Sequence, residues 1–582
     1  MANLHYKIAC MTLLSGVFFS STADATTLRE AGVLQHPIEH PSAQGLLHHH
    51  GSAPLSEKHR QTLEYYGPWL TAKGYSSNAQ ELILSINDAR VHGLNPEAYN
   101  LSAILKTASS IAQLSSANTP KTGGSSELTS AIAYYRVNFD KQLGEAFTAL
   151  ANDLGKGATK AQEVQRQMFR AAPKVNAQEW LNAISKGRIT VSQALDSLMP
   201  HDQAYHRLTA RMRELLAERN SHKTRINVEE SEERAKEFVA HDIQRIKLRL
   251  IETGELPKNT ELNSEWDGNV QYALQAFQQR SGIPVSGTAD TRTRKSLNLT
   301  LDKEIEAVAL SLERWRWMPR VLGRKHLLVN LPDYQVVVRK DEKTLLSLAT
   351  VVGAAVHATP TFSEDLQHIV FNPTWTVPKS ITNRELIPRE RRKPGYLKSR
   401  NFDIMQRDGD YLVKVDYDDV TTEDLNADRF PYVLQQRSGD GNALGRMKFM
   451  MPNQWSIYMH DTQAKRLFTH NDRAYSHGCI RLSDPEIMAR TLLHEDGYTA
   501  QEIDAALALT DRKLVRLRTP IPTHITYMTS WVDEYGTLNR RTDVYNHDEA
   551  LISALKTNNT LLTILNQLPV ISMVEGRVPN SS

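Results

Sequence analysis

Cysteine is almost absent from this chain, and its scarcity limits the chemistry available. The 582 residues contain two cysteines, Cys10 and Cys479. We expect the first to be removed with a leader, so Cys479 has no partner for an internal disulfide, which excludes a disulfide-rich scaffold. A single thiol of this kind is either a small buried core residue or a reactive nucleophile.

Charge of one sign and long apolar runs are also lacking. The chain has 69 basic and 66 acidic residues and a net charge of +3, which gives no support to a nucleic-acid partner. Beyond the first residues, no segment is long and apolar enough to predict a stable membrane span. At about 150 residues per domain, the length predicts three or four domains.

The first 25 residues have the pattern of a secretory signal peptide. Lys7 precedes a short apolar run over 8–19, and Ala23-Asp24-Ala25 has the form of a cleavage site. An uncleaved signal anchor is the alternative. Lipid attachment at Cys10 is disfavoured because most of the apolar run follows that residue. We expect residues 26–56 to form a linker, in which the run 48–50 of histidines lacks other metal ligands nearby.

The segment 460–482 has the composition of a reactive site. Gly478 lets the backbone approach Cys479 closely, and His477 is a poor companion for a buried apolar thiol, so the pattern favours a reactive cysteine. An adjacent imidazole favours the thiolate form. Strand alternation places Tyr458 and His460 on one face, with residues 457 and 459 on the other.

The spacing in this segment resembles the signature of the L,D-transpeptidases with the YkuD-type fold. His460 is followed by fifteen residues and then by Ser476-His477-Gly478-Cys479-Ile480-Arg481. The helix-rich N-terminal half and the run from Trp531 to Asp548 resemble their large periplasmic members. The resemblance implies that Cys479 attacks the third residue of a donor tetrapeptide of peptidoglycan. D-Ala leaves, a thioester forms, and an amine on a second stem resolves it as a 3→3 cross-link.

The resemblance also implies roles for individual residues. His460 activates Cys479, and the carbonyl of Asp461 fixes the tautomer of its ring. The N–H groups of Gly478 and Cys479 are the expected oxyanion donors. Further residues are expected to line the substrate site: Tyr458, Asp461, Ser476, His477 and Arg481. For the last two, a bracing role in the loop is an equal alternative. A paired thiol and imidazole can share one proton as a coupled thiolate and imidazolium.

The family further implies a periplasmic enzyme of cell wall biogenesis and cell shape that is a carbapenem target. Its expected partners are peptidoglycan stem peptides and glycan, with other cell-wall enzymes, and no metal or organic cofactor is expected. Other readings stay open. An L,D-carboxypeptidase or a lipoprotein-attaching enzyme would use the same nucleophile. A non-catalytic peptidoglycan-binding scaffold belongs to another class. A zinc peptidase would need ligands such as His460, Asp461, His470 and His477, whose spacing is unfamiliar.

The pattern of elements predicts a multidomain α+β protein. The expected parts are a helical N-terminal scaffold (57–240), a three-helix peptidoglycan-binding-like module (241–300), a mainly β catalytic domain (320–520) and a C-terminal tail (521–582) that packs on the scaffold or the catalytic domain. In the scaffold we expect short helices, with a Ser/Thr/Gly-rich loop over 109–126. In the module, Ala273, Leu274 and Phe277 are expected in the core, and Gly254 is a candidate C-cap.

A long polar segment interrupts the catalytic domain at 378–444. Its length indicates a functional or disordered insertion, and resemblance to the large periplasmic members implies a subdomain that caps the active site. Its basic residues, between 389 and 400, could attract carboxylates, although such a run is more typical of a solvated face. After Cys479, Asp484 and Pro485 predict the start of a helix, which would place the thiol on the turn that leads into it.

Overall fold

The computed structural model describes residues 67–71, 74–117, 126–164, 166–169, 173–221, 225–237, 239–426 and 428–561. The predicted signal peptide, the linker and the end of the tail lie outside this set. The chain divides into two compact units, one comprising Met1–Ser76, Asn100–Leu143 and Ile564–Ser582 and the other Ser77–Tyr99 and Gly144–Thr563. Among the described helices, none combines the length and the apolar character that crossing a membrane requires.

The first unit is helical with one small hairpin. Its described elements are β1 (Leu70–Thr71), β2 (Gly74–Tyr75), α5 (Leu101–Ala117) and the first part of α6 (Ser126–Lys156). A small apolar cluster joins Leu114 to Leu128 and Ala131. The expectation of a loop from residue 109 onward is wrong, because α5 continues to residue 117, and α6 with 31 residues is far from short. Serine is compatible with the helix here because the Ser110 and Ser116 hydroxyls donate to carbonyls of the preceding turn.

The second unit begins with helices, among which α10 (Gln203–Asn220) packs against α15 (Leu301–Arg316). The others are α4 (Ser77–Asp88), η1 (Ala89–His92), η2 (Pro96–Tyr99), α7 (Ala161–Val164), α8 (Ala177–Ser185), α9 (Val191–Leu198) and α11 (Glu232–Glu237). Buried Glu313 on α15 accepts from the Thr159 N–H at 2.8 Å and pairs with Arg316 at 2.6 Å. A buried carboxylate needs such partners, and they fix the 157–159 turn against α15.

The three-helix module forms as predicted, with its own core. Its helices are α12 (Val239–Thr253), α13 (Gly268–Arg280) and α14 (Thr291–Leu297). Ala273, Leu274 and Phe277 are buried together with residues from α12 and α14. Gly254 follows α12 with φ +92°, the left-handed conformation that favours glycine at a helix end.

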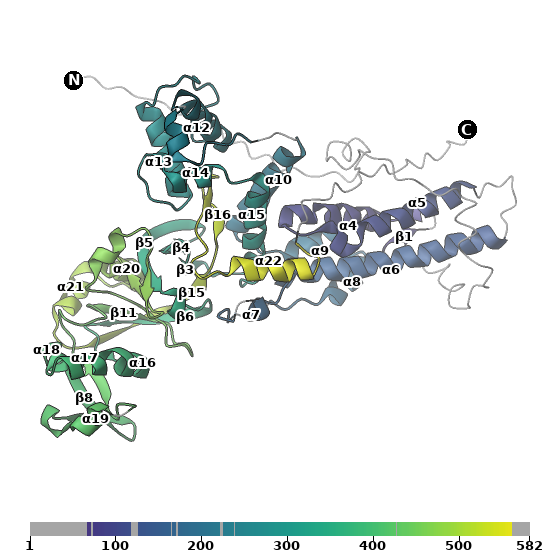
Figure 1. Cartoon of the computed structure of the whole chain (residues 1–582). Coiled ribbons are helices and arrows are strands. Elements are labelled where there is room, and N and C mark those ends of the chain that lie inside the picture. The colour runs from purple at the N-terminus through teal and green to yellow at the C-terminus, as the bar shows by residue number, and fades with distance from the viewer. Residues whose placement is uncertain are drawn as a thin grey trace, which may run out of the picture. The chain divides into compact units, whose positions relative to one another are not determined.

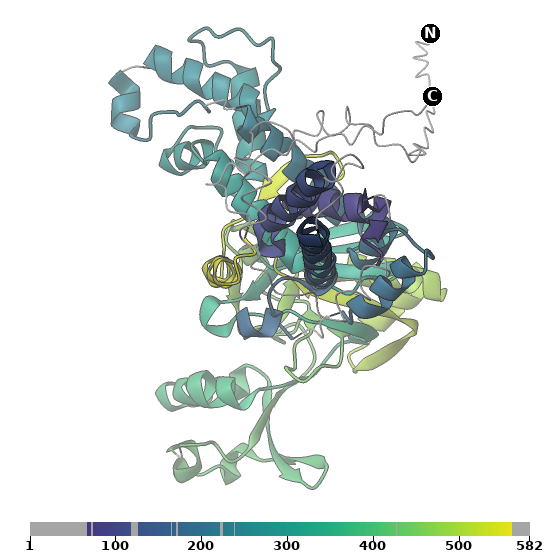
Figure 2. The ribbon, with the colours of Figure 1, turned by 90° about the vertical axis from the view of Figure 1, so that its right-hand side faces the viewer.

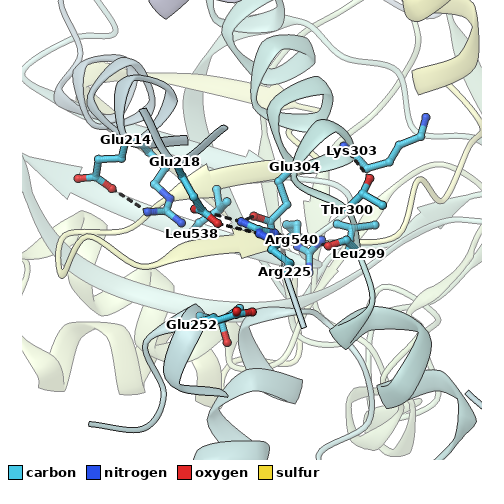
Figure 3. A network of polar contacts seen from close by, with 12 residues as sticks. Glu214, Glu218, Arg225, Glu252, Leu299, Thr300, Lys303, Glu304, Leu538 and Arg540 are labelled. Atoms are coloured by element: carbon cyan, nitrogen blue, oxygen red, sulfur yellow. Dashed lines mark hydrogen bonds and ion pairs between the residues drawn. The ribbon is translucent and has the colours of Figure 1, made fainter. Parts of the chain in front are cut away.

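A buried polar network lies where the module meets α15 and the C-terminal segment (Figure 3). Arg225 bonds to Glu218 and to Glu304, each at 2.9 Å. Arg540 lies 3.8 Å from the other oxygen of Glu304. Burial would raise the pKa of Glu304, but the Arg540 and Arg225 guanidiniums outweigh burial and hold it below its usual value. The network therefore depends on Glu304 remaining ionised.

A nine-stranded sheet organises the region that follows (Figure 1). Its order is β13-β5-β14-β12-β11-β6-β15-β3-β4, and β4 returns to pair with β5, so most strands have two neighbours. The strands are β3 (Lys325–Asn330), β4 (Gln335–Lys340), β5 (Lys343–Gly353), β6 (Ser363–Phe371), β11 (Met447–Met450), β12 (Met459–His460), β13 (Ala474–Ser476), β14 (Ile480–Leu482) and β15 (Lys513–Thr526), with η3 (Ala355–His357) and η6 (Lys465–Thr469) between them. The first two of these strands, β3 and β4, form an antiparallel hairpin.

The main core lies on one face of this sheet. It contains Phe371, Phe449 and Met459, together with residues of the helices α20 (Pro485–Leu493) and α21 (Ala500–Ala508). These helices, joined through η7 (His494–Asp496), lie against the sheet in Figure 1. The alternation of buried residues along each strand leaves the opposite face for polar side chains.

The insertion folds as a separate subdomain between β6 and β11. It has a four-stranded sheet of β7 (Trp375–Thr376), β10 (Val433–Gln436), β8 (Phe402–Asp408) and β9 (Tyr411–Val415), with α16 (Lys379–Ile381), the π-helix η4 (Thr382–Leu386), α17 (Ile387–Arg392), α18 (Tyr396–Ser399), η5 (Tyr417–Asp419) and α19 (Thr422–Asn426). Its own core includes Leu386, Leu397 and Leu434. Figure 2 shows these elements gathered together.

The end of the described chain returns to both the helices and the sheet. It contains β16 (Ser530–Val532), β17 (Leu538–Arg540) and α22 (Asp548–Thr557). Arg314 of α15 pairs with Asp548 at 2.6 Å, and the Tyr545 hydroxyl donates to the carbonyl of Gly353 at 2.8 Å. Three residues separate the end of β15 at Thr526 from the start of β16 at Ser530.

Candidate active site

Two neighbouring parallel strands bring His460 beside the cysteine. In β12 and β14, Met459 pairs with Ile480 and His460 with Arg481. Met459 and Ile480 are buried in the core, so their neighbours Tyr458, His460, Cys479 and Arg481 face the other side. The rings of Tyr458 and His460 lie 5.6 Å apart, which confirms the predicted shared face.

Glycine and serine shape the turn that presents the thiol. Gly478 has φ +114°, and an added Cβ would meet Ile457 at 3.2 Å. The hydroxyl of Ser476 accepts from the Gly478 N–H at 3.0 Å and donates to the Cys479 carbonyl at 2.6 Å. The Gly478 carbonyl accepts from the hydroxyl of Thr359 at 2.7 Å. This part of the chain is therefore fixed on both sides of Gly478.

This geometry corrects two expectations. The Gly478 N–H is not an available oxyanion donor, because it already donates to Ser476. No described residue accepts from the N–H of Cys479, so that group is the remaining candidate oxyanion donor. The thiol also does not lie on a turn leading directly into a helix, since β14 separates Cys479 from α20, although Asp484 caps that helix as predicted by accepting from Ile487 N–H at 3.0 Å.

The thiol is half-buried and protonated at rest. Cys479 is free, and its sulfur lies 3.7 Å from the carbonyl oxygen of Ser456. Burial raises the pKa of the Cys479 thiol, while hydrogen bonds from Tyr458 and the cations of Lys448 and Arg481 oppose that effect without overcoming it. A thiol in this state needs a base before it can attack a carbonyl.

His460, on the strand beside the cysteine, is the candidate base. Its ring is 5% exposed, and its Nδ1 lies 2.5 Å from the carbonyl oxygen of Asp461. A carbonyl can only accept, so Nδ1 carries the proton and Nε2 keeps its lone pair. Burial and, after it, the Arg481 guanidinium together lower the pKa of His460 to about 3. The imidazole is therefore neutral near pH 7, and the resting pair is a neutral thiol and a neutral imidazole rather than the expected coupled ion pair.

The side chains of Asp461 and Ser476 form hydrogen bonds within the protein. The Asp461 carboxylate accepts from the N–H groups of Arg446 and Thr462 at 2.8 and 2.7 Å, and from Lys465 at 2.8 Å. Ser476 is 2% exposed, with both of its contacts inside the turn. These contacts give both side chains a bracing role, and they do not support the prediction that either lines the substrate site.

Tyr458 lies between the thiol and a lysine that the sequence did not single out. Lys448 Nζ lies 3.8 Å from the centre of the Tyr458 ring, and Lys448 pairs with His460 across β11 and β12. Burial raises the pKa of Tyr458 far above its usual value, and the Cys479 sulfur raises it further. The hydroxyl thus keeps its proton and can donate. The alternation of β11 beside the predicted His460 strand was the signal that could have identified Lys448.

His477 points into the insertion rather than to the sulfur. Its Nε2 lies 2.5 Å from an oxygen of Glu385 in η4, and its ring stacks on His357 at 4.9 Å. Arg481 is half-buried, and its Nε has no partner among the described residues. Burial lowers the pKa of Arg481, an effect that Cys479 opposes. No sequence pattern pointed to Glu385, because its contact depends on how the insertion folds.

Metal ligands are not grouped in the described part of the chain. No cluster of three or more His, Cys, Asp or Glu side chains able to hold an ion occurs there. The zinc-peptidase reading therefore has no ligand set in that part. What the site does contain is a thiol and a neutral imidazole on adjacent strands, which is the equipment of a cysteine nucleophile with a histidine base.

Comparison with known proteins agrees with this class. Residues 324–503 match the family model described as the YkuD L,D-transpeptidase catalytic domain, and residues 61–212 match one described as a scaffold domain. Residues 324–503 are therefore similar to a YkuD L,D-transpeptidase catalytic domain and residues 61–212 to a scaffold domain. The fold around them is α+β, helical in its N-terminal region and mainly β in the part that matches the catalytic domain.

A protein of Haemophilus influenzae named as an L,D-transpeptidase is 30% identical over 261 residues, which are 44% of this chain and 50% of the relative. The chain thus spans about half the length of that relative. Among solved structures, L,D-transpeptidases of Stackebrandtia nassauensis and Xylanimonas cellulosilytica are 12% and 10% identical. Each covers 49% of this chain, at TM-scores of 0.19 and 0.17, and the alignment spans 91% and 92% of the respective structures. Scores this low support no inference about this chain.

Proposed function

We propose that the protein is a cysteine-dependent L,D-transpeptidase that forms 3→3 cross-links between peptidoglycan stem peptides through a thioester. The observation that carries the proposal is the fixed tautomer of His460, whose Nε2 is left as a base on the strand beside Cys479. The catalytic-domain match over 324–503 supports the same reaction class. The expected location is the periplasm, and the expected role is cell wall biogenesis, including cell shape.

In the first half-reaction, His460 Nε2 takes the proton of Cys479, and the sulfur attacks the carbonyl of the third stem residue. A C–S bond forms and the carbonyl oxygen becomes an oxyanion. The free N–H of Cys479 and the protonated hydroxyl of Tyr458 are the proposed donors to it, an interaction worth about 3 kcal/mol of barrier for a donor of this kind. The C–N bond to D-Ala then breaks, and imidazolium at His460 protonates the leaving amine.

In the second half-reaction, an amine on a second stem attacks the thioester. His460 removes a proton from that amine, the C–S bond breaks, and the thiol is regenerated when the imidazolium returns its proton. Water in place of the amine would give the L,D-carboxypeptidase product, and a lipoprotein amine would give attachment to the wall. All three use the same residues, so the acceptor decides among them. A purely binding scaffold would need neither His460 nor a deprotonated thiol.

The insertion is proposed to cover the site. The contact between Glu385 and His477 joins its π-helix to the turn that holds Cys479. A π-helix costs stability and is frequent at functional positions, which agrees with this placement. The basic side chains of α17 remain proposed as solvated, since Arg391 and Arg392 are exposed and bond to backbone carbonyls of the insertion itself.

The test is product analysis with purified protein. A donor tetrapeptide stem and an amine-bearing acceptor stem are incubated together, and the muropeptides are separated and identified by mass. We expect a 3→3 dimer with release of D-Ala, and none with Cys479→Ser. Tripeptide without dimer would establish the carboxypeptidase instead. Absence of any acylation of the wild-type protein, by the tetrapeptide or by a carbapenem, would contradict the proposal.

A further inference from the structure

Four basic side chains extend from the cysteine across the same face of the sheet. His368 on β6 lies directly opposite Arg516 on β15, and Lys448 on β11 lies diagonally from His368. Arg512 comes immediately before β15, two residues from Leu514, which pairs with Val370 of β6. Alternation puts these side chains on the face opposite the core, because Phe449, Ile369 and Val515 point into the core.

These groups affect one another and reach the thiol. Burial lowers the pKa of His368, and Arg516, Arg512 and Lys448 lower it further. Burial also lowers the pKa of Lys448, the Cys479 sulfur opposes this, and Arg512 adds to it. The four basic groups are therefore neighbours in the strand register, and their charges act on one another. It forms a row, called here the basic row, that starts beside Cys479 and ends at Arg516.

The basic row has no acidic partner within the described part of the chain. Among the described residues, Lys448, Arg512 and Arg516 form no salt bridge. No described group bonds to the buried Nδ1 of His368. Cations gathered on one face repel each other, and partial burial of Lys448 makes the lack of a counter-ion costly. Because the protein supplies no carboxylate to this row, the row is suited to bind a carboxylate of a ligand.

We propose that the basic row binds free carboxylates of the acidic peptide substrate and orients it toward Cys479. This inference rests on the proposed function and adds the substrate feature that the enzyme recognises. Lys448 lies closest to the reacting sulfur and therefore takes a carboxylate near the scissile bond. His368 and the two arginines take a second carboxylate further along the peptide. An amidated peptide lacks both charges and loses these contacts.

The experiment compares two donor tetrapeptides that differ only in whether their side-branch carboxylates are free or amidated. For the wild type we expect kcat/KM to favour the free acid by about fivefold, a size typical of a few partly exposed ion pairs, and to lose that preference in high salt. Arg512→Gln combined with Arg516→Gln removes the preference by slowing the free-acid donor only. Lys513→Gln, between them on the core-facing side of β15, is the matched control and keeps it.

A second measurement does not require transpeptidation. Alkylation of Cys479 by iodoacetate, an anion, is compared with alkylation by neutral iodoacetamide and is followed by peptide mass. The wild type should show a higher iodoacetate to iodoacetamide ratio than the double variant, with equal iodoacetamide rates in both. If the ratio is the same in both proteins, or if the two donors are used equally well, the basic row does not bind the substrate. If the iodoacetate to iodoacetamide ratio is higher in the wild type than in the double variant but no cross-linked product forms, the basic row binds anions and the proposed function is wrong.

Discussion

The Nε2 atom of His477 lies 2.5 Å from a carboxylate oxygen of Glu385, which places a residue of the insertion in direct contact with the turn that carries Cys479. The partner residues come from a π-helix at 382–386 and from the Ser-His-Gly-Cys motif, nearly a hundred positions further along the chain. This contact separates the two histidines of the motif by role. His477 has its partner in the insertion, and His460 is the base in the proposed reaction.

Replacing Glu385 should loosen the insertion without disabling the thiol. Glu385→Ala removes the partner of His477, so we expect faster hydrogen exchange over 379–400 and a KM for the tetrapeptide raised by about threefold, in keeping with a half-exposed ion pair. Alkylation of Cys479 by iodoacetamide should be unchanged. Glu423→Ala, at an exposed position of α19 in the same subdomain, is the control. Unchanged exchange in Glu385→Ala would show that the contact does not hold the insertion.

Replacing His460 should change the pH dependence of acylation. A base whose pKa is lowered to about 3 stays neutral at all higher pH, so the wild-type acylation rate should be nearly flat between about pH 5 and 8. Without that base, the rate in His460→Ala follows the thiolate fraction and rises about tenfold per pH unit below the raised pKa of Cys479. The measurement is β-lactam acylation followed by intact mass. If His460→Ala keeps the wild-type pH profile of acylation and His477→Ala changes it, His477 rather than His460 is the base.

The same histidine predicts a dependence of stability on pH. Its pKa is lowered on folding, so the unfolded chain binds a proton that the folded chain does not, and stability falls as pH drops below about 6.5. From pH 7 to pH 5 the apparent Tm of the wild type should therefore fall further than that of His460→Gln, which cannot take up the proton. Scanning calorimetry at both values tests this. Equal falls in the two proteins would show that His460 is solvated or protonated in the folded state.

Ser476 should act through the shape of the turn. Ser476→Ala leaves the N–H of Gly478 and the carbonyl of Cys479 without their partner, at a cost of about 1–3 kcal/mol for buried groups. We expect a lower apparent Tm together with a loss of kcat larger than any change in KM. Ser476→Thr retains the hydroxyl and should recover most of both. A raised KM with an unchanged kcat would indicate that Ser476 contacts the substrate, as the sequence suggested.

Glu304 should be essential to the position of the three-helix module. Glu304→Gln leaves the Arg225 and Arg540 guanidiniums buried without their shared carboxylate, a change that typically costs about 3–5 kcal/mol. We expect a lower apparent Tm and faster hydrogen exchange in α12 to α14, with little effect from Glu306→Gln on the outer side of α15. Because the pKa of Glu304 is lowered, the same loosening should occur in the wild type as pH falls through that lowered value.

Local pattern predicted the parts of the site that depend on neighbours in sequence. Alternation placed Tyr458 with His460, and the Asp484 and Pro485 pair marked the start of α20. The contacts that sequence reasoning missed join distant segments. Lys448 reaches Tyr458 from another strand, Tyr545 supports Gly353 from the tail, and Glu385 reaches His477 from the insertion. Such contacts depend on strand order, which spacing along the chain does not specify.

The sequence pattern also could not predict which backbone N–H groups are available to bind an oxyanion. The motif suggested that both Gly478 and Cys479 present N–H groups to an oxyanion, and only the folded turn reveals that Ser476 has already taken one of them. The protonation state of the resting pair is a further case. Residue types alone allowed a thiolate and an imidazolium, whereas burial of both groups favours the neutral forms.

The fate of Cys479 in the presence of a donor tetrapeptide is the most direct test of the proposed thioester mechanism. Rapid quenching in acid followed by peptide mass should show Cys479 carrying the donor minus D-Ala, as a thioester that disappears when an acceptor amine is added and a cross-linked dimer appears. His460→Ala should accumulate this adduct far more slowly near neutral pH. A wild-type protein that makes dimer with Cys479 unmodified throughout, or a Cys479→Ser variant that still makes dimer, would contradict the account.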